Sequence, residues 1–372
     1  MKKVLFIIKK EPVLAAAWLL AVLSSLFVPP SKEYAEYIDG RTLGILWSLM
    51  VIMKGFHHEY VFECIGNGLI AFTKKVWQLV LVLVFLCFVF SMVITNDVAL
   101  ITFVPFSIML LHKCERDDLV LIVVVLQTVA ANLGSMMTPI GNPQNLYLYG
   151  LSGMSIEHFI KYMFPYAAVS GLLLLVFIFF IKGKNRRIEV KEQGITHIRN
   201  KKKTVIYALL FVLALLTVLH VVPYYVLLAG VFVVVLVIQR QLLWEADYHL
   251  LLMFLGFFIF TGNLSKMDGI QEVLGSLVKN REMFSAIACS QVISNVPAAL
   301  LLSGFTKKYK LLLLGVNFGG LGTLIASMAS LISFKFYACT EQAKTGRYIV
   351  VFTVVNLVFL AVLCLTFFMQ SR

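Results

Sequence analysis

Long apolar runs separated by short charged stretches dominate this sequence and limit the folds open to it. Hydrophobic residues fill 60% of the 372 positions and charged residues only 14%, whereas a soluble domain is usually about a quarter charged. About 20 apolar residues are enough to cross a hydrocarbon core of about 30 Å. The pattern therefore predicts an all-α polytopic membrane protein with no soluble domain. The apolar runs lie at about 13–28, 42–56, 76–94, 97–112, 117–140, 160–181, 204–221, 224–239, 248–264, 283–293, 296–305, 311–334 and 347–369.

The basic residues, which give a net charge of +13, lie between these runs rather than in one patch. Residues 182–203 hold nine Lys and Arg against two Glu, which predicts a cytoplasmic linker. The lysines at the start of the chain are then expected in the cytoplasm as well. This distribution is typical of topology signals, so the lipid bilayer is the expected partner and nucleic acid is not.

Two polar turns interrupt apolar sequence and predict helical hairpins. The runs on either side of Ser294 and Asn295 hold only about a dozen residues each, so neither crosses a bilayer alone. Together they predict a hairpin that enters the membrane and leaves on the same side. The runs around Asn96 are longer, so that hairpin is either spanning or, by analogy with the second, re-entrant.

The two halves of the chain share polar and glycine positions. "SMVITN" at 91–96 matches "SQVISN" at 290–295, and "NLGSMMTPIGNPQNL" at 132–146 aligns without a gap to "NFGGLGTLIASMASL" at 317–331. We therefore expect a duplication. An odd number of crossings separates the hairpins, which predicts two inverted-topology repeats. The first repeat is predicted over 1–181, with a hairpin around 80–112 and a broken helix at 117–150. After the linker at 182–203, the second repeat is predicted over 204–372, with a hairpin around 283–305 and a broken helix at 311–334.

The aligned segments also predict the broken helices. Pro139 and Pro143 lack an N–H donor and Gly141 permits unusual dihedral angles, so an α-helix is expected to break there. Backbone groups left free inside a membrane cost several kcal/mol each, so a break is kept where it binds something. Helix N-termini suit an anion and free carbonyl groups suit Na⁺. This architecture is typical of secondary transporters.

The motifs "TNDVAL", "TPIGNPQN" and "SNVPAAL" resemble the ion transporter superfamily over nearly the whole chain. That superfamily includes the arsenite permease/sodium–proton antiporter and citrate transporter families and the divalent anion/sodium symporter fold. The chain looks most like a short bacterial branch of anion transporters. The resemblance implies an elevator-type motion of the hairpin-bearing unit in a homodimer, within a bacterial inner membrane.

The resemblance also implies the site residues, because the superfamily's hairpin tips and broken helices contact substrate carboxylate and sodium. The substrate-binding candidates are Thr95, Asn96, Thr138, Gly141, Asn142, Pro143, Asn145, Ser294, Asn295, Thr323 and Ser327. The Na⁺ candidates are Asn96, Asp97, Asn132, Asn142, Asn295 and Asn317.

Asp97 departs from the family pattern, since the dicarboxylate symporters have Thr at the third tip position and the second tip here has Val296. An intramembrane carboxylate is functional by default, which favours proton or ion coupling by Asp97. The alternative is that Asp97 caps the following helix. In the same way, Asn132 and Asn317 either bind ligand or join helices.

These patterns predict a secondary active transporter of a small anion, such as citrate or a dicarboxylate, coupled to Na⁺ or H⁺. The alternative on the same fold is a sodium–proton antiporter or an arsenite/oxyanion exporter. We expect no cofactor, with Na⁺ as a candidate coupling ion. An intramembrane enzyme needs an acid–base or metal constellation at membrane depth, and the sequence shows none.

Overall fold

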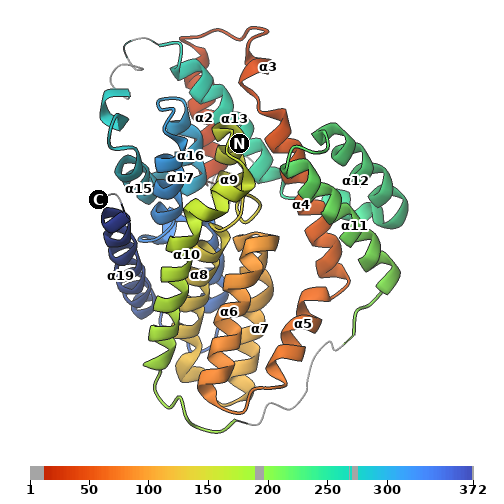
Figure 1. The fold of residues 1–372 in the computed structure, drawn as a ribbon, viewed down its shortest axis with the longest axis vertical. Helices are drawn as coiled ribbons and strands as arrows, with labels where there is room; N and C mark the ends of the chain where they lie inside the picture. The colour runs from red at the N-terminus through yellow and green to blue at the C-terminus, as the bar shows by residue number, and fades with distance from the viewer. Residues whose placement is uncertain (1–11, 189–196, 268, 270–274, 371–372) are drawn as a thin grey trace.

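The computed structural model describes residues 12–188, 197–267, 269 and 275–370, and within these ranges the chain is helical with no named strand (Figure 1). The helices before the linker are α2 (Pro12–Ser25), α3 (Tyr34–Tyr37), α4 (Gly40–His58), α5 (Val61–Ile70), α6 (Val76–Ile94), α7 (Asn96–Lys113), η1 (Asp117–Leu119), α8 (Val120–Ser135), α9 (Pro143–Ser152) and α10 (Ile156–Phe179). Those after it are α11 (Lys201–Val218), α12 (Tyr224–Gln239), η2 (Arg240–Trp244), α13 (Tyr248–Leu264), α15 (Glu282–Ile293), α16 (Asn295–Ser303), α17 (Tyr309–Gly319), η3 (Leu324–Ala326), α18 (Met328–Ala338) and α19 (Thr345–Gln370).

Several of these helices have the length and composition of membrane spans, which confirms the predicted all-α polytopic membrane protein. Among the described residues, five helical segments are long and apolar enough to cross a bilayer. Shorter apolar helices lie beside them, including α2, α13 and α15. The five segments are Val76–Ile94, Asp117–Ser135, Ile156–Phe179, Tyr224–Trp244 and Thr345–Gln370.

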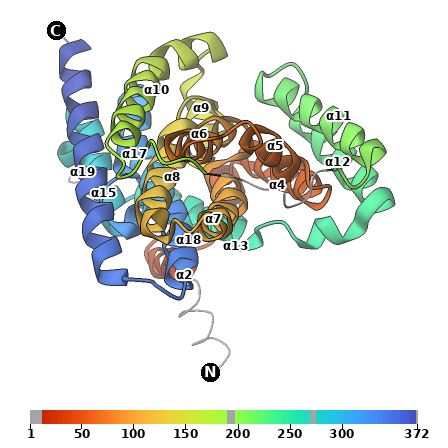
Figure 2. The ribbon, with the colours of Figure 1, turned by 90° about the horizontal axis from the view of Figure 1, so that it is seen from below.

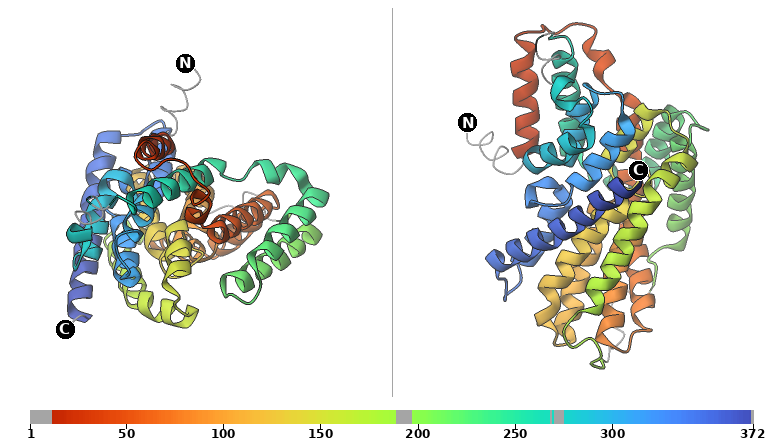
Figure 3. Two further views of the ribbon diagram at one scale, coloured as in Figure 1. Left: turned by 90° about the horizontal axis from the view of Figure 1, so that it is seen from above. Right: turned by 60° about the vertical axis from the view of Figure 1, so that its left-hand side comes forward.

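The two hairpins lie in opposite halves of the molecule. Helices α6 and α7 fill the lower part of Figure 1, and α15 and α16 lie in the upper part. The right-hand view of Figure 3 keeps this arrangement. Helices α15 and α16 hold 12 and 9 residues, in agreement with the short second hairpin expected from the sequence. The inverted duplication and its limits at 1–181 and 204–372 stay predictions.

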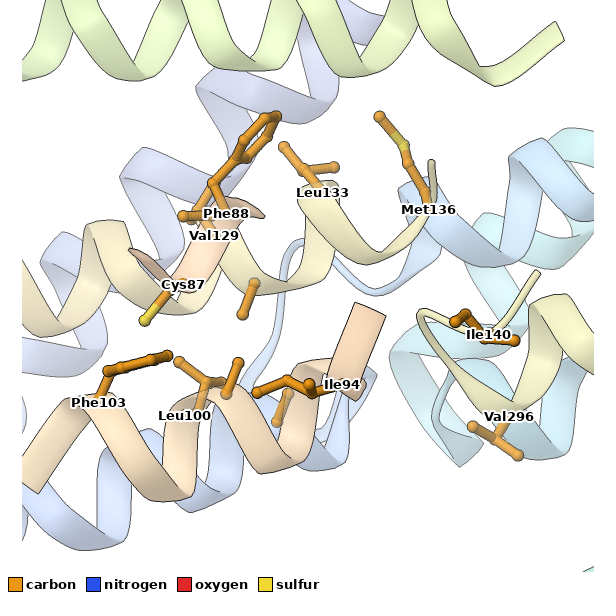
Figure 4. Packing of buried hydrophobic residues seen from close by; sticks show 14 of the residues in the cluster. Cys87, Phe88, Ile94, Leu100, Phe103, Val129, Leu133, Met136, Ile140 and Val296 are labelled. Atoms are coloured by element: carbon orange, nitrogen blue, oxygen red, sulfur yellow. The ribbon is translucent and has the colours of Figure 1, made fainter. Parts of the chain in front are cut away.

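Helix α8 lies at the centre of the lower half, and nearly all of its residues are buried. It contacts α6, α7, α10, α18 and α19, which surround it in the view from below (Figure 2). A helix buried on every side in this way lies at the core of the bundle. In Figure 4, Val129 and Leu133 of α8 lie close to Cys87 and Phe88 of α6. The first hairpin and the first broken helix therefore share one packed core.

Helices α11 and α12 form an arm beside α4, away from this core (Figure 2). Their outward faces carry exposed apolar side chains such as Leu209, Phe232 and Val237. Apolar surface of this kind is expected where a helix faces lipid.

Some predicted features fall on residues that the structure does not describe. The linker's segment 189–196 and the basic start of the chain are among them, so the N-terminal orientation stays a prediction. The boundaries elsewhere shift by a few residues: the first hairpin begins at Val76 and ends at Lys113, and the broken helices reach Ser152 and Ala338.

Close helix packing depends on two glycines at aligned positions, and alanine there should destabilise the protein. A Cβ added at Gly134 would overlap the backbone carbonyl of Phe88, and one added at Gly319 would lie 2.7 Å from Cβ of Ser290. We expect G134A and G319A each to lower the free energy of unfolding by about 1–3 kcal/mol, because such overlap forces the helices apart. Thermal unfolding of the purified protein measures the effect.

The matched control is G68A in α5, where an added Cβ meets no atom within 4 Å. Alanine has the higher helix propensity by about 1 kcal/mol, so G68A should leave stability equal or higher. Equal stability of all three variants would contradict the close packing.

Candidate functional site

Both hairpins turn through one residue with the same unusual backbone conformation. Thr95, between α6 and α7, has φ 74° and ψ 149°, and Ser294, between α15 and α16, has φ 74° and ψ 156°. Side chains rarely tolerate this region, and each such residue costs about 1–3 kcal/mol of strain. The sequence aligned these two positions, and the structure gives them the same conformation. Strain that is kept in this way is typical of functional sites.

Each turn contacts the broken helix of its own half. The backbone N–H of Asn96 donates to the carbonyl of Gly141 at 3.1 Å. In the second half, the Ser294 hydroxyl donates to the carbonyl of Ala326 at 3.4 Å. Gly141 and Ala326 are aligned positions, so each tip donates a hydrogen bond to the equivalent loop carbonyl of its own half.

The threonines of the two breaks repeat this relation. Thr138 Oγ1 donates to the carbonyl of Met92, and Thr323 Oγ1 donates to the carbonyl of Gln291 at 3.2 Å. Met92 and Gln291 are aligned, as are the two threonines. Each threonine therefore joins its break to the last turn of the first helix of its own hairpin, which is α6 for Thr138 and α15 for Thr323. The hydroxyl proton of each threonine is used in that hydrogen bond.

Asn132, near the end of α8, reaches across to the second broken helix. Its Oδ1 accepts from Ser327 Oγ at 3.0 Å and from Asn96 Nδ2 at 3.2 Å. Its Nδ2 lies 3.4 Å from Ser330 Oγ and 3.4 Å from the carbonyl of Gly320. Asn132 thus joins the first hairpin tip to the second break.

Asn317, at the end of α17, makes the reciprocal contacts. Its Oδ1 accepts from Asn142 Nδ2 at 3.1 Å, and its Nδ2 donates to Asn145 Oδ1 at 2.7 Å. Asn142 and Asn145 are the positions aligned with the two serines that Asn132 contacts. Such reciprocal pairs are expected of a duplicated unit related by a two-fold axis. We call these residues together the central amide cluster: Asn96, Asn132, Asn142, Asn145, Asn317, Ser327 and Ser330.

Side chains of the first break satisfy its own backbone. Asn142 Oδ1 caps α9 by accepting from the N–H of Asn145 at 2.8 Å, and Pro143 begins the helix. Asn145 Nδ2 lies within 3.3 Å of the carbonyls of Ser135, Met136 and Thr138. A Cβ atom added at Gly141 would overlap the backbone carbonyl of Ser135, so a larger residue does not fit there.

The second break uses Gln291, a residue that the sequence reasoning did not select. Its Nε2 donates to the carbonyls of Gly319 and Leu321 at 2.9 Å each, and its Oε1 accepts from the N–H of Thr323 at 2.9 Å. Gly322 lies beside it with φ 113°. The signal in the sequence was a glutamine inside an apolar run of the hairpin.

The two tip asparagines differ in their contacts. Asn96 donates from Nδ2 to Asn132, whereas Asn295 makes only a 3.4 Å contact, between its Oδ1 and the Ser294 hydroxyl. Within the described ranges, no hydrogen bond of the Asn295 amide nitrogen is formed, although the residue is only 4% exposed. Among the described residues, the second tip therefore has an amide donor without a partner.

Asp97 lies in the first turn of α7, and its Oδ1 is buried. No described residue forms a hydrogen bond with that oxygen, and the N-cap position of α7 is held by Thr95, not by Asp97. The backbone N–H of Asp97 donates instead to Asn96 Oδ1 at 3.0 Å. This geometry gives no support to the capping role and leaves the carboxylate available.

The hairpins and breaks bring four helix N-termini to the centre, those of α7, α9, α16 and α18. Each N-terminus carries about half a positive charge. The N–H groups of Asn96 and Asp97 in α7 and of Asn145 in α9 already donate within the protein. The ends of α6, α8, α15 and α17 bring carbonyl groups to the same region. Over the described ranges, no group of three or more His, Cys, Asp or Glu side chains is placed to hold a metal.

Broken helices whose ends meet inside a bundle of apolar helices are typical of membrane transporters. The sequence pattern of the citrate transporter family matches residues 4–307, and the chain belongs to that family. The chain is 33% identical to the inner membrane protein YbiR of Escherichia coli, over 84% of each protein. It is 31% identical to the uncharacterized transporter MJ0456 of Methanocaldococcus jannaschii, over 89% of this chain and 90% of that one.

A Dictyostelium discoideum protein with the name "Putative transporter arsB" is 24% identical over 35% of this chain and 23% of its own length. These matches confirm the superfamily expected from the motifs. They make the protein a multi-pass membrane transporter of the citrate transporter and anion permease type, with a transport role rather than catalysis.

Glycine at either tip should stabilise the protein, because it relieves the strain of the positive φ. We expect T95G and S294G each to raise the free energy of unfolding by about 1 kcal/mol over the corresponding alanine variants. The alanine variants T95A and S294A are the matched controls, since they lose the hydroxyl but keep the strain. Thermal unfolding gives the comparison. Glycine variants that unfold below the alanine variants would contradict the strained turns.

Proposed function

We propose that this protein is a secondary active transporter of a small anion, a carboxylate such as citrate or a dicarboxylate. The observation that carries the proposal is the meeting of four helix N-termini at the two hairpin tips and two breaks. Helix N-termini bind carboxylate groups through free N–H donors and the helix dipole. The tip residues Thr95, Asn96, Ser294 and Asn295 add side-chain donors beside them.

The breaks would supply the rest of the binding site. Asn142 caps α9, Ser327 occupies the N-cap position of α18 without a capping bond, and Thr138, Gly141, Pro143, Asn145 and Thr323 shape the loops. Their side-chain polar atoms are engaged within the protein, so we assign them to positioning of the N–H donors. The free amide of Asn295 is the strongest single candidate for direct contact with substrate.

We propose Na⁺ or H⁺ as the coupling ion. Carbonyl groups at the ends of α6, α8, α15 and α17 are ligands that suit Na⁺. Among the side-chain candidates, Asn132 Oδ1 already accepts two hydrogen bonds and Asn317 Oδ1 accepts one. Asp97 has the one unpartnered carboxylate oxygen among the proposed side-chain ligands, so we assign it the coupling role, as a Na⁺ ligand or a proton carrier.

The proposed transport cycle is an elevator motion in a homodimer. The contacts of Asn132 and Asn317 join the two breaks to each other and to the first hairpin tip, and Ser294 joins the second tip to its own break. The hairpins and breaks therefore form one unit. Such a unit can move as a rigid body against α4, α11 and α12, which pack together beside it. The homodimer rests on the resemblance to the superfamily.

An oxyanion or arsenite exporter, or a sodium–proton antiporter, is the second candidate function. The likeness to the transporter named arsB favours it, although that match covers a third of this chain. A site lined with neutral donors suits an oxyanion as well as a carboxylate. The two functions differ in substrate and share the tips and breaks.

Counterflow in proteoliposomes separates the two functions and tests the tips. We expect labelled citrate or succinate to exchange in a Na⁺- or H⁺-dependent manner and arsenite to fail. N96A and N295A should each lower exchange by at least about tenfold, the usual effect of losing a buried hydrogen bond to a charged group.

The matched control is N356A in α19, a buried asparagine whose amide bonds only to its own helix, at the Phe352 carbonyl. It should keep most of the exchange. Arsenite exchange without carboxylate exchange would favour the second function. Full carboxylate exchange by both tip variants would contradict the proposed site.

Replacing Asp97 tests the coupling. D97N keeps the shape of the side chain and removes its ability to ionise, so we expect net uptake against a gradient to lose its dependence on pH or Na⁺. Uptake at several pH values and Na⁺ concentrations, with N96A as the variant that loses binding instead, measures this. A wild-type pH and Na⁺ profile in D97N would remove Asp97 from the mechanism.

A further inference from the structure

We propose that this protein binds the phosphate headgroup of an anionic phospholipid in a cavity at the base of the first hairpin, far from the hairpin tips. The cavity has a volume of about 1280 Å³. It lies between the ends of α7, α10 and α18 and the starts of α8 and α19, at the end of the molecule that Figure 2 faces. The inference does not depend on the proposed substrate.

Arg116, in the loop between α7 and α8, is the centre of the proposed site. Its side chain is only 6% exposed, and it lines the cavity. Its Nε and Nη2 bond to the Asp118 carboxylate at 2.8 and 3.0 Å, and Nη2 also donates to the carbonyl of Lys182. The third nitrogen, Nη1, is buried and has no partner among the described residues.

Arg116 lines the cavity, and a buried guanidinium N–H without a partner is a donor for an anionic oxygen. Gly183 lies beside this nitrogen, and a Cβ added there would be 3.4 Å from Nη1.

Four further basic residues line the cavity with exposed side chains: Lys182, Arg186, Lys344 and Arg347. None of the four forms an ion pair with a described residue. Of the acidic residues that line it, Asp118 pairs with Arg116 and Asp117 lies 3.0 Å from His112. Only Glu115 and Glu341 remain unpaired there, so the free charges favour an anion.

The other wall of the cavity is apolar. It includes Phe177, Phe180 and Val351, and Phe180 is 77% exposed. Phe177 lies in α10, Phe180 directly follows that helix, and Val351 lies in α19. Both helices have the composition of membrane spans. A ligand with a phosphate at one end and acyl chains at the other fits both walls. A free phosphate ion uses only the basic one.

Native mass spectrometry of the purified, delipidated full chain tests this site. The probes are phosphatidylglycerol, phosphatidylcholine and soluble glycerol 3-phosphate. We expect the wild-type protein to retain one phosphatidylglycerol at concentrations that leave phosphatidylcholine unbound. The double variant K344Q/R347Q, which alters exposed side chains without ion pairs, should weaken retention by about tenfold or more, since each base near a membrane surface contributes about 1 kcal/mol.

The matched control is K32Q/K307Q, which removes two exposed, unpaired lysines elsewhere and should retain the lipid fully. A second variant, R116K, keeps the charge but loses the fork of the guanidinium group, and should also weaken retention. Equal retention of both phospholipids, or full retention by K344Q/R347Q, would overturn the proposal. Displacement of the lipid by equimolar glycerol 3-phosphate would assign the site to a free phosphate instead.

Discussion

Backbone groups of a helix that is broken inside a membrane have no water to satisfy them, and this requirement shapes the centre of the molecule. The protein meets it twice, with Asn142 and Asn145 at the first break and Gln291 at the second. The hairpin tips accept strain to reach the same place, at Thr95 and Ser294. A chain that only needed stability would have continuous helices here. The breaks and the strain therefore indicate a binding role.

The same contacts connect local structure to motion. Asn132 and Asn317 each cross from one half to the other, so the tips and breaks form one unit instead of two. A unit of this kind can carry a bound anion through the membrane without exposing its free backbone groups to lipid. The asymmetry between the halves then assigns different tasks: Asn295 keeps a free donor, and Asp97 keeps an unpartnered carboxylate oxygen. The duplication explains what the halves share, and the differences are where specificity and coupling are expected.

The sequence predicts much of this architecture, because polar and glycine residues stand out inside apolar runs. The hairpin turns at Asn96 and Asn295, the breaks and the helix class all follow from that contrast. The sequence does not predict which amide meets which, since the pairing of Asn132 with Ser327 depends on how the two halves pack. It also misses Gln291, whose role comes from the backbone of a loop distant in the sequence. The cavity around Arg116 is unpredictable for the same reason, as its walls come from three separate stretches of the chain, 105–122, 177–186 and 336–351.

The central claim is that the two hairpin tips and two helix breaks form one anion site. A cryo-electron microscopy map at side-chain resolution, recorded with a saturating amount of the anion that exchanges best in counterflow, tests it most directly. The account predicts density between the tips at Thr95–Asn96 and Ser294–Asn295, within hydrogen-bond distance of the Asn295 amide. Bound anion elsewhere in the bundle, with the tips unoccupied, would contradict it.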